Sequence, residues 1–123
     1  MNNVELLKQI YAGADGVVEN FAEDFTLISP GNAQTAGTFI GVDEATRHVD
    51  DFQRLSDGTY EMENLDTFLA NDAFGMVVSR ITAKRDGNEL DMTGLGLWEF
   101  AGGKVKTHWE LPADLSEWDK FWA

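Results

Sequence analysis

The sequence contains no cysteine among its 123 residues, and it has only 9 basic residues against 22 acidic ones. The absence of cysteine excludes disulfide bonds, thiolate nucleophiles and cysteine-ligated zinc. The formal net charge of -13 disfavours nucleic acid and anionic membrane surfaces as partners, because their phosphate groups would repel the protein. The acids are spread over both halves of the chain, which is typical of a solvated shell and names no substrate.

Long apolar runs and export signals are also absent. No window approaches the roughly 18 apolar residues of a membrane span, and residues 1–5 show no basic region followed by an apolar stretch. We therefore expect a cytoplasmic protein without membrane association. Hydrophobic residues make up 43% of the chain and aromatic residues 11%. This composition indicates one folded domain over residues 1–123, with a large interior or a lined cavity.

The spacing of apolar residues changes from helical to extended along the chain. Three- and four-residue spacing predicts helix over residues 4–25, broken near residues 14–16, and a second helix over residues 42–55. Residues 25–29 read as a short strand and residues 32–37 as a loop. Long strands are predicted at 59–70, 73–85, 88–100 and 104–111, with a last helix at 115–122 capped by Asp114. We therefore expect an α+β fold, with a curved antiparallel sheet around N-terminal helices and a pocket between the layers.

Three stretches carry a family resemblance that spans nearly the whole chain. They are SPGNAQTAGTFIG at 29–41, AGGKVKTHWELPADL at 101–115 and EWDKFWA at 117–123. Together with the order of elements, they resemble the SnoaL-like branch of the nuclear transport factor 2-like (NTF2-like) superfamily. The resemblance implies a cone-shaped, cystatin-like fold with an apolar pocket, and a homodimer. Relatives include polyketide cyclases, ketosteroid isomerases, limonene-type epoxide hydrolases and non-catalytic binding proteins, so the fold does not choose among these activities.

The ketosteroid isomerase pattern is incomplete in this sequence. That pattern needs a carboxylate base and two oxyanion donors, a tyrosine and a protonated aspartate. Tyr11 matches the tyrosine, but Ser29 stands where the base should precede the proline. Gly96 stands where the acid is expected, four residues before Phe100. Since one of three groups remains, steroid-type isomerisation by that mechanism is disfavoured.

The epoxide hydrolase and cyclase patterns differ in what they require. The hydrolase pattern uses an arginine and two acids around one water molecule. Arg80 and Glu110 fit two of these positions, Thr82 replaces the remaining acid, and Asp91 on the next strand is a possible substitute. The polyketide cyclase pattern needs one acid/base group in a shaped apolar pocket, and His108 or Glu110 can supply it.

The expected site combines catalytic and substrate-binding residues. Glu110 or His108 is expected to act as acid or base, while Tyr11 and Arg80 stabilise negative charge. The expected substrate-binding residues are His48, Asp91, Ser29, Trp98, Trp109 and Phe52. No metal-ligand spacing, phosphate-binding loop or dinucleotide fingerprint occurs, so we expect no metal and no cofactor.

Two questions stay open at the level of sequence. Alternation with Val105, Thr107, Trp109 and Leu111 would put His108 and Glu110 on the solvent side of their strand, whereas the resemblance puts Glu110 in the pocket. The function is also open between a cofactor-free acid/base enzyme on a small apolar organic molecule, a non-catalytic binding protein, and a dimeric interaction domain.

Overall fold

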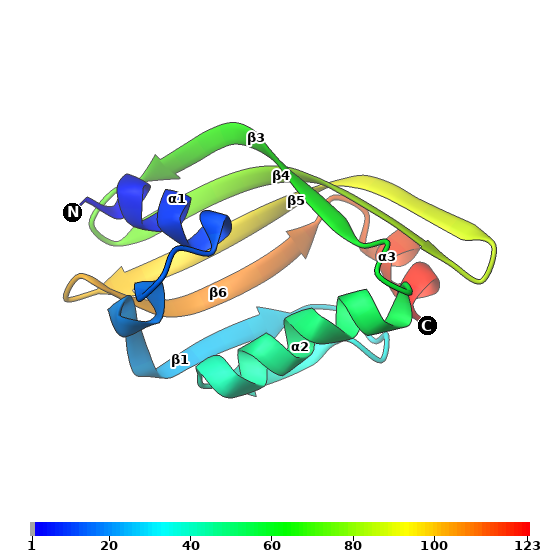
Figure 1. Ribbon diagram of the computed structural model, residues 1–123, viewed down its shortest axis with the longest axis horizontal. Helices are drawn as coiled ribbons and strands as arrows, with labels where there is room; N and C mark the ends of the chain where they lie inside the picture. The colour runs from blue at the N-terminus through cyan, green and yellow to red at the C-terminus, as the bar shows by residue number, and fades with distance from the viewer. Residues whose placement is uncertain (1) are drawn as a thin grey trace.

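The structure is a computed structural model that describes residues 2–123. In chain order, these residues form α1 (Asn3–Ala12), a 3₁₀ helix η1 (Val17–Asn20), β1 (Phe21–Ser29), β2 (Gly37–Ile40), α2 (Val42–Leu55), β3 (Glu61–Ala70), β4 (Phe74–Arg85), β5 (Asn88–Ala101), β6 (Lys104–Pro112) and α3 (Leu115–Trp122). Figure 1 shows α1 and α2 on the same side of one curved sheet, with α3 near its end. The expected α+β class is confirmed.

The six strands lie in the order β2-β1-β6-β5-β4-β3. The four long strands β3 to β6 form the expected antiparallel meander. β1 pairs with β6 in parallel and with β2 in antiparallel orientation, so the sheet as a whole is mixed and not purely antiparallel. The two central strands are β6 and β5, and the side chains on their inner face lie beneath the helices.

The helix boundaries follow from local signals. The Asn2 side chain caps α1 by accepting from the Glu5 amide, and Gly13 ends α1 in a left-handed conformation at φ 65°. The Asp114 side chain caps α3 at a distance of 3.0 Å from the Glu117 nitrogen, as expected. The predicted helix 42–55 and the break after α1 are both confirmed.

The extent of β1 differs from the prediction. Residues 21–24 belong to β1 and not to a helix that continues to residue 25. The spacing of four between Phe21 and Phe25 suits one helix face, but it also puts both rings on one face of a strand. Their rings pack edge to face at 4.8 Å. The four-residue strand β2 was missed, because Gly37 and Thr38 give no clear alternation.

The turns of the meander are as expected. Asp86 and Gly87 have φ values of 52° and 79°, and Gly102 and Gly103 have values of 59° and 76°. Positive φ at both central residues is the geometry of tight hairpin turns that match sheet twist. The Asn71 side chain closes the β3–β4 turn by accepting from the Phe74 amide at 2.8 Å.

A β-bulge on β6 settles which face His108 and Glu110 occupy. Phe100 pairs with Val105, but Glu99 pairs with Thr107, so β6 advances by two residues for one on β5. The extra residue reverses the alternation along the strand. Val105 is therefore buried before the bulge, while His108 and Glu110 face inward after it. The prediction from the resemblance is confirmed for Glu110, and strict alternation fails because of the bulge.

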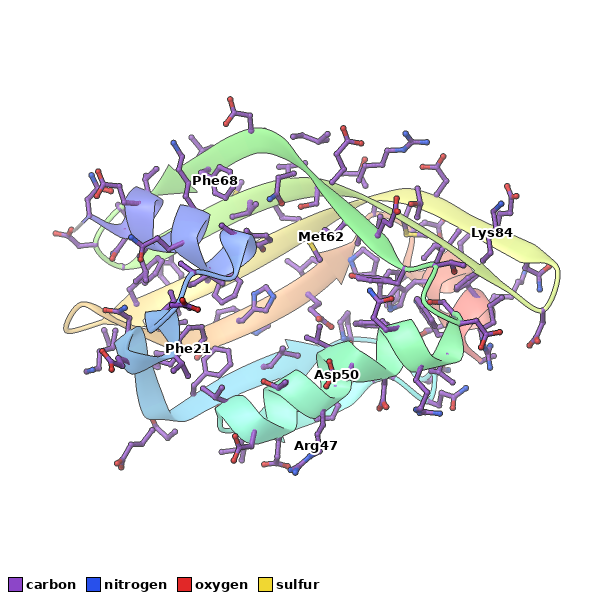
Figure 2. All side chains as sticks on the ribbon, in the orientation of Figure 1. Phe21, Arg47, Asp50, Met62, Phe68 and Lys84 are labelled. Atoms are coloured by element: carbon purple, nitrogen blue, oxygen red, sulfur yellow. The ribbon has the colours of Figure 1, made fainter. Side chains whose placement is uncertain are left out.

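Two apolar clusters fill the space between helices and sheet. One surrounds Leu7, Val77 and Trp98 under α1, and the other surrounds Phe52, Ile81 and Trp122 under α2 and α3. In Figure 2, Phe21 and Met62 lie inside the outline of the sheet and helices, whereas Arg47 extends from α2 to the outside. Within the described residues, no helix has both the length and the apolarity to cross a bilayer.

Candidate functional site

A cavity of about 490 Å³ opens between the helices and the inner face of the sheet. This volume lies in the range of small-molecule sites. Its apolar wall comes from every layer of the fold and includes Ile10, Phe21, Leu27, Val42, Phe52 and Trp98. A chamber of about 40 Å³ adjoins it and shares Tyr11, Tyr60, Met62, His108 and Glu110 with the main cavity. The polar groups are therefore concentrated where the two spaces meet.

Glu110 is held in this wall by a histidine of α2. His48 Nε2 lies 2.8 Å from Glu110 Oε1, and the His48 side chain is only 1% exposed. The His48 ring is stacked on Phe39 with centroids 4.4 Å apart and meets Phe52 edge to face at 4.9 Å. His48 is not a lining residue of the cavity, and it contacts Glu110 from the side of α2. It orients one carboxylate oxygen and leaves the other available on the cavity side.

Tyr11 and Trp98 form a second polar unit. The Trp98 indole N–H donates to the Tyr11 hydroxyl at 3.1 Å, and the two rings meet edge to face at 5.8 Å. Burial raises the pKa of Tyr11 to about 12, so its hydroxyl keeps its proton. A Cβ atom at Gly96 would collide with this hydroxyl and would lie 3.0 Å from Trp98 Nε1. Glycine at position 96 thus makes room for the Tyr11 hydroxyl.

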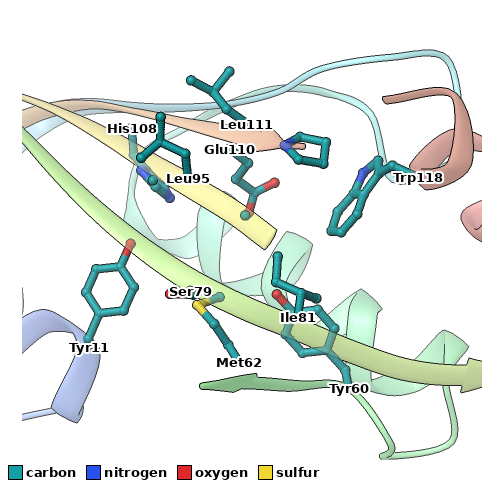
Figure 3. A pocket seen from close by; sticks show the side chains of 13 residues that line it. Tyr11, Tyr60, Met62, Ser79, Ile81, Leu95, His108, Glu110, Leu111 and Trp118 are labelled. Atoms are coloured by element: carbon teal, nitrogen blue, oxygen red, sulfur yellow. The ribbon is translucent and has the colours of Figure 1, made fainter. Parts of the chain in front are cut away.

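His108 is buried against the same unit. Its Nδ1 lies 3.1 Å from the carbonyl oxygen of Leu97, and its ring is stacked on Trp98 with centroids 3.6 Å apart. A carbonyl can only accept, so Nδ1 carries the proton. Burial lowers the pKa of His108 to about 4, which keeps the ring neutral near pH 7. In Figure 3 the Tyr11 hydroxyl points toward His108, and Glu110 projects into the space beyond them.

Polar lining residues that the sequence reasoning missed include Tyr60 and Asn64. Tyr60 lines both spaces, and its burial raises the pKa of its hydroxyl above the ordinary value. Asn64 lies at the rim of the cavity, where its Oδ1 accepts from Ser79 at 3.2 Å. The available signal was the alternation of Tyr60, Met62 and Asn64, which share one face of β3 and its approach.

Arg80 and Asp91 do not reach the cavity. Arg80 shares one face of β4 with Phe74, Met76 and Val78, and this row faces the side of the sheet opposite the cavity. Arg80 Nε donates to Asp91 Oδ1 at 2.9 Å, and both side chains are more than half exposed. The hydrogen bond from Arg80 lowers the pKa of Asp91. The expected roles of these residues in the pocket are corrected, because neither lines the cavity or the chamber, and it is the odd-numbered row of β4, with Ser79 and Ile81, that faces the chamber.

Ser29 and Trp109 are also outside the set of lining residues. Trp109 pairs with Leu97 on the outer face of the sheet, since the bulge turns the even-numbered residues of β6 inward. Ser29 is buried, and its Oγ has no hydrogen-bond partner among residues 2–123. Of the expected site residues, the structure brings Tyr11, Phe52, Trp98, His108 and Glu110 to the cavity and places His48 behind Glu110.

The arrangement offers proton acceptors and donors in an apolar enclosure. Glu110 can accept a proton, and Tyr11 can donate a hydrogen bond to an oxygen that becomes negative. Within residues 2–123, no three His, Asp or Glu side chains are grouped so that they could hold a metal ion. The side chains available for chemistry in this space are thus carboxylate, imidazole and phenol.

The model of the SnoaL-like domain matches residues 11–108. The chain belongs to the SnoaL-like family. A relative, the uncharacterised protein Rv0034 of Mycobacterium tuberculosis, is 33% identical over 103 residues, which cover 84% of this chain and 79% of the relative. The expected SnoaL-like membership is therefore confirmed. Structures described as cystatin-like and NTF2-like, at 23% and 18% identity, share the fold.

Solved structures agree with this family assignment. Bal32a, from a soil-derived mobile gene cassette, superimposes with a TM-score of 0.87 at 28% identity and covers 98% of this chain and 96% of its own. TerC, co-crystallised with polyporic acid, superimposes with a TM-score of 0.78 at 16% identity and covers 97% of this chain and 96% of its own. At that low identity, TerC shows the fold alone.

Proposed function

We propose that this SnoaL-like protein is an acid/base enzyme, working without a cofactor, on a small and mostly apolar organic molecule. The observation that carries the proposal is the Glu110 carboxylate, held from behind by His48 and facing an aromatic cavity that the Tyr11 hydroxyl also enters. Tyr11, Tyr60, His108 and Glu110 give the cavity four titratable side chains. This concentration supports catalysis over binding alone.

The proposed chemistry starts with removal of a proton from carbon. The free oxygen of Glu110 takes a proton from the carbon next to a substrate carbonyl, and the C–H electron pair moves to form an enolate. The enolate oxygen accepts a hydrogen bond from Tyr11, which stabilises the new negative charge in a site of low polarity. Return of the proton from Glu110 to another atom of the same molecule completes an isomerisation or, after carbon–carbon bond formation, a cyclisation.

The positions of Arg80, Ser29 and Gly96 disfavour two of the reaction types found in the family. Arg80 lies on the outer face, so the arginine of the epoxide hydrolase pattern is missing from the cavity. Ser29 and Gly96 replace two of the three groups of the ketosteroid isomerase pattern. Polyketide cyclase-like closure needs only one acid/base group and a shaped pocket. Of the family's activities, that chemistry fits the lining residues best.

Proton exchange with solvent tests the proposal before the natural substrate is known. Cyclic ketones that raise the midpoint of thermal unfolding are incubated with the protein in D₂O, and deuterium incorporation beside the carbonyl is followed by NMR. We expect exchange above the buffer rate with the native protein. The Glu110→Gln variant should lose about 10²- to 10⁴-fold of that exchange, the usual contribution of a positioned base.

The control for this experiment is Glu89→Gln, which removes an exposed carboxylate from β5. It should exchange at the native rate. If ketones bind but Glu110→Gln exchanges as fast as the native protein, Glu110 is not the base. If no bound ketone exchanges above the buffer rate, the non-catalytic binding function replaces the enzymatic one.

We further propose that the protein is a homodimer joined through the outer face of the sheet. Exposed apolar side chains gather there, including Phe74 at 46%, Met76 at 37% and Leu111 at 37% exposure. Apolar groups gathered on a sheet face are typical of an interface, and a two-fold axis pairs the same patch on both copies. Light scattering should give twice the chain mass, and Met76→Glu should give a monomer. The matched control is Ile40→Glu, because Ile40 is an exposed apolar residue of the edge strand β2.

A further inference from the structure

The hydrogen-bonding role of His108 is set by its neighbours. Its Nδ1–H donates to the Leu97 carbonyl, and Trp98 covers one face of the ring. A neutral imidazole with a proton on Nδ1 has an unprotonated Nε2, which can only accept. Nε2 has no hydrogen-bond partner among residues 2–123, and His108 lines both the cavity and the small chamber. A ligand at this position must therefore bring a donor.

The role of Tyr11 is set in the opposite sense. Its oxygen already accepts from the Trp98 indole, so its own O–H is free to donate. Tyr11 and His108 are close together, because both lie against the space above Gly96: a Cβ there would collide with the Tyr11 hydroxyl and would lie 3.1 Å from His108 Cε1. The two side chains thus present one donor and one acceptor to neighbouring atoms of a ligand.

The charge of the cavity disfavours anions. Among residues 2–123 that line it, none is lysine or arginine, and Glu110 is the acidic one. A carboxylate or phosphate entering this space would find no lysine or arginine in the lining to balance its charge.

We propose that the substrate class is an uncharged cyclic hydroxy-ketone, whose carbonyl oxygen accepts from Tyr11 and whose hydroxyl donates to His108. His108 is then a specificity-determining residue that accepts a hydrogen bond from the ligand hydroxyl and does not carry the transferred proton. That the ligand carries a carbonyl group rests on the proposed function, whereas that it carries a hydroxyl group rests on the contacts of His108 alone. Burial, which lowers the pKa of His108, supports the acceptor role at neutral pH.

Three ligands of matched ring size test the inference by calorimetry at neutral pH. They are α-tetralone, its derivative with one ring hydroxyl, and the corresponding ring carboxylate. With the native protein, the hydroxy-ketone should bind about tenfold more tightly than the parent ketone, as one well-formed hydrogen bond predicts. The carboxylate should bind more weakly than both. His108→Phe, which keeps a ring beside Trp98 and removes the acceptor, should abolish the preference for the hydroxyl.

Any one of three results would overturn the inference. The carboxylate could bind most tightly, none of the three ligands could bind, or the preference for the hydroxyl could persist in His108→Phe. His108→Gln keeps an acceptor oxygen, so it should retain part of the preference and shows whether the phenylalanine variant failed for reasons of folding. Glu110→Gln should keep the preference while losing proton exchange. Exchange that persists in Glu110→Gln would therefore contradict the catalytic role alone, whereas a hydroxyl preference that persists in His108→Phe would contradict the role of His108 alone.

Discussion

His48 Nε2 lies 2.8 Å from Glu110 Oε1 and joins α2 to β6 at the wall of the cavity. The two residues are 62 positions apart in the chain. His48 is fully enclosed between Phe39 and Phe52, so its ring has little freedom to turn. A carboxylate fixed in this way is oriented before the ligand arrives, which is how a buried neighbour assists acid/base chemistry.

Removing the support from Glu110 should slow proton exchange without removing the base. We expect His48→Leu to lower ketone exchange about 10- to 100-fold, since a hydrogen bond to a charged group contributes about 1.5–3 kcal/mol. His48→Gln, whose amide can reach the same carboxylate, should recover much of the rate. Exchange and ligand affinity are measured on both variants. Equal rates in the leucine and glutamine variants would mean that His48 acts only through packing.

A methyl group at position 96 should damage the site through one specific collision. Gly96→Ala places a Cβ against the Tyr11 hydroxyl, so we expect a lower unfolding midpoint and weaker ketone binding. Tyr11→Phe removes that hydroxyl. The double variant should therefore lose less stability than the two single changes summed, as denaturant unfolding would show in a double-mutant cycle. Simple additivity would contradict the predicted contact.

The buried His108 should make stability depend on pH in a definite direction. Its folded pKa of about 4 lies below the ordinary value of 6.5, so the unfolded chain binds more protons between these values. Stability should fall as the pH decreases from about 6.5 to about 4, by roughly 3 kcal/mol from this residue. His108→Gln, measured by denaturant unfolding across the same range, should show a shallower decline because only the remaining groups titrate. An unchanged slope would contradict a neutral, buried His108.

The pair on the outer face should be irrelevant to the cavity. Arg80→Ala should leave ketone binding and proton exchange at native levels, because Arg80 and Asp91 are exposed on the opposite side of the sheet. In the same variant the pKa of Asp91 should rise toward its ordinary value of 3.8, since the hydrogen bond that lowers it is gone. NMR titration of the Asp91 carboxyl checks this. A loss of exchange would bring Arg80 back into the site.

The predictable part of the structure comes from local chemistry. Asp114 caps α3, Gly13 ends α1, and Asp86-Gly87 turns β4 into β5, as the sequence indicates. These features depend on one to four neighbouring residues. Phe21 was assigned to a helix because a spacing of four residues fits both a helix face and a strand face. Only pairing with β6 distinguishes them, and that pairing lies far away in the sequence.

The sequence by itself determined the α+β class, the helix at 42–55, the four long strands with the last helix, and the types of group available for chemistry. Tertiary structure decided which row faces the cavity, because the direction of a row depends on where the helices pack and not on alternation alone. The bulge between Val105 and Thr107 turned His108 and Glu110 inward and Trp109 outward. The contact between His48 and Glu110 was also decided by tertiary structure, since it exists only once α2 packs over the sheet.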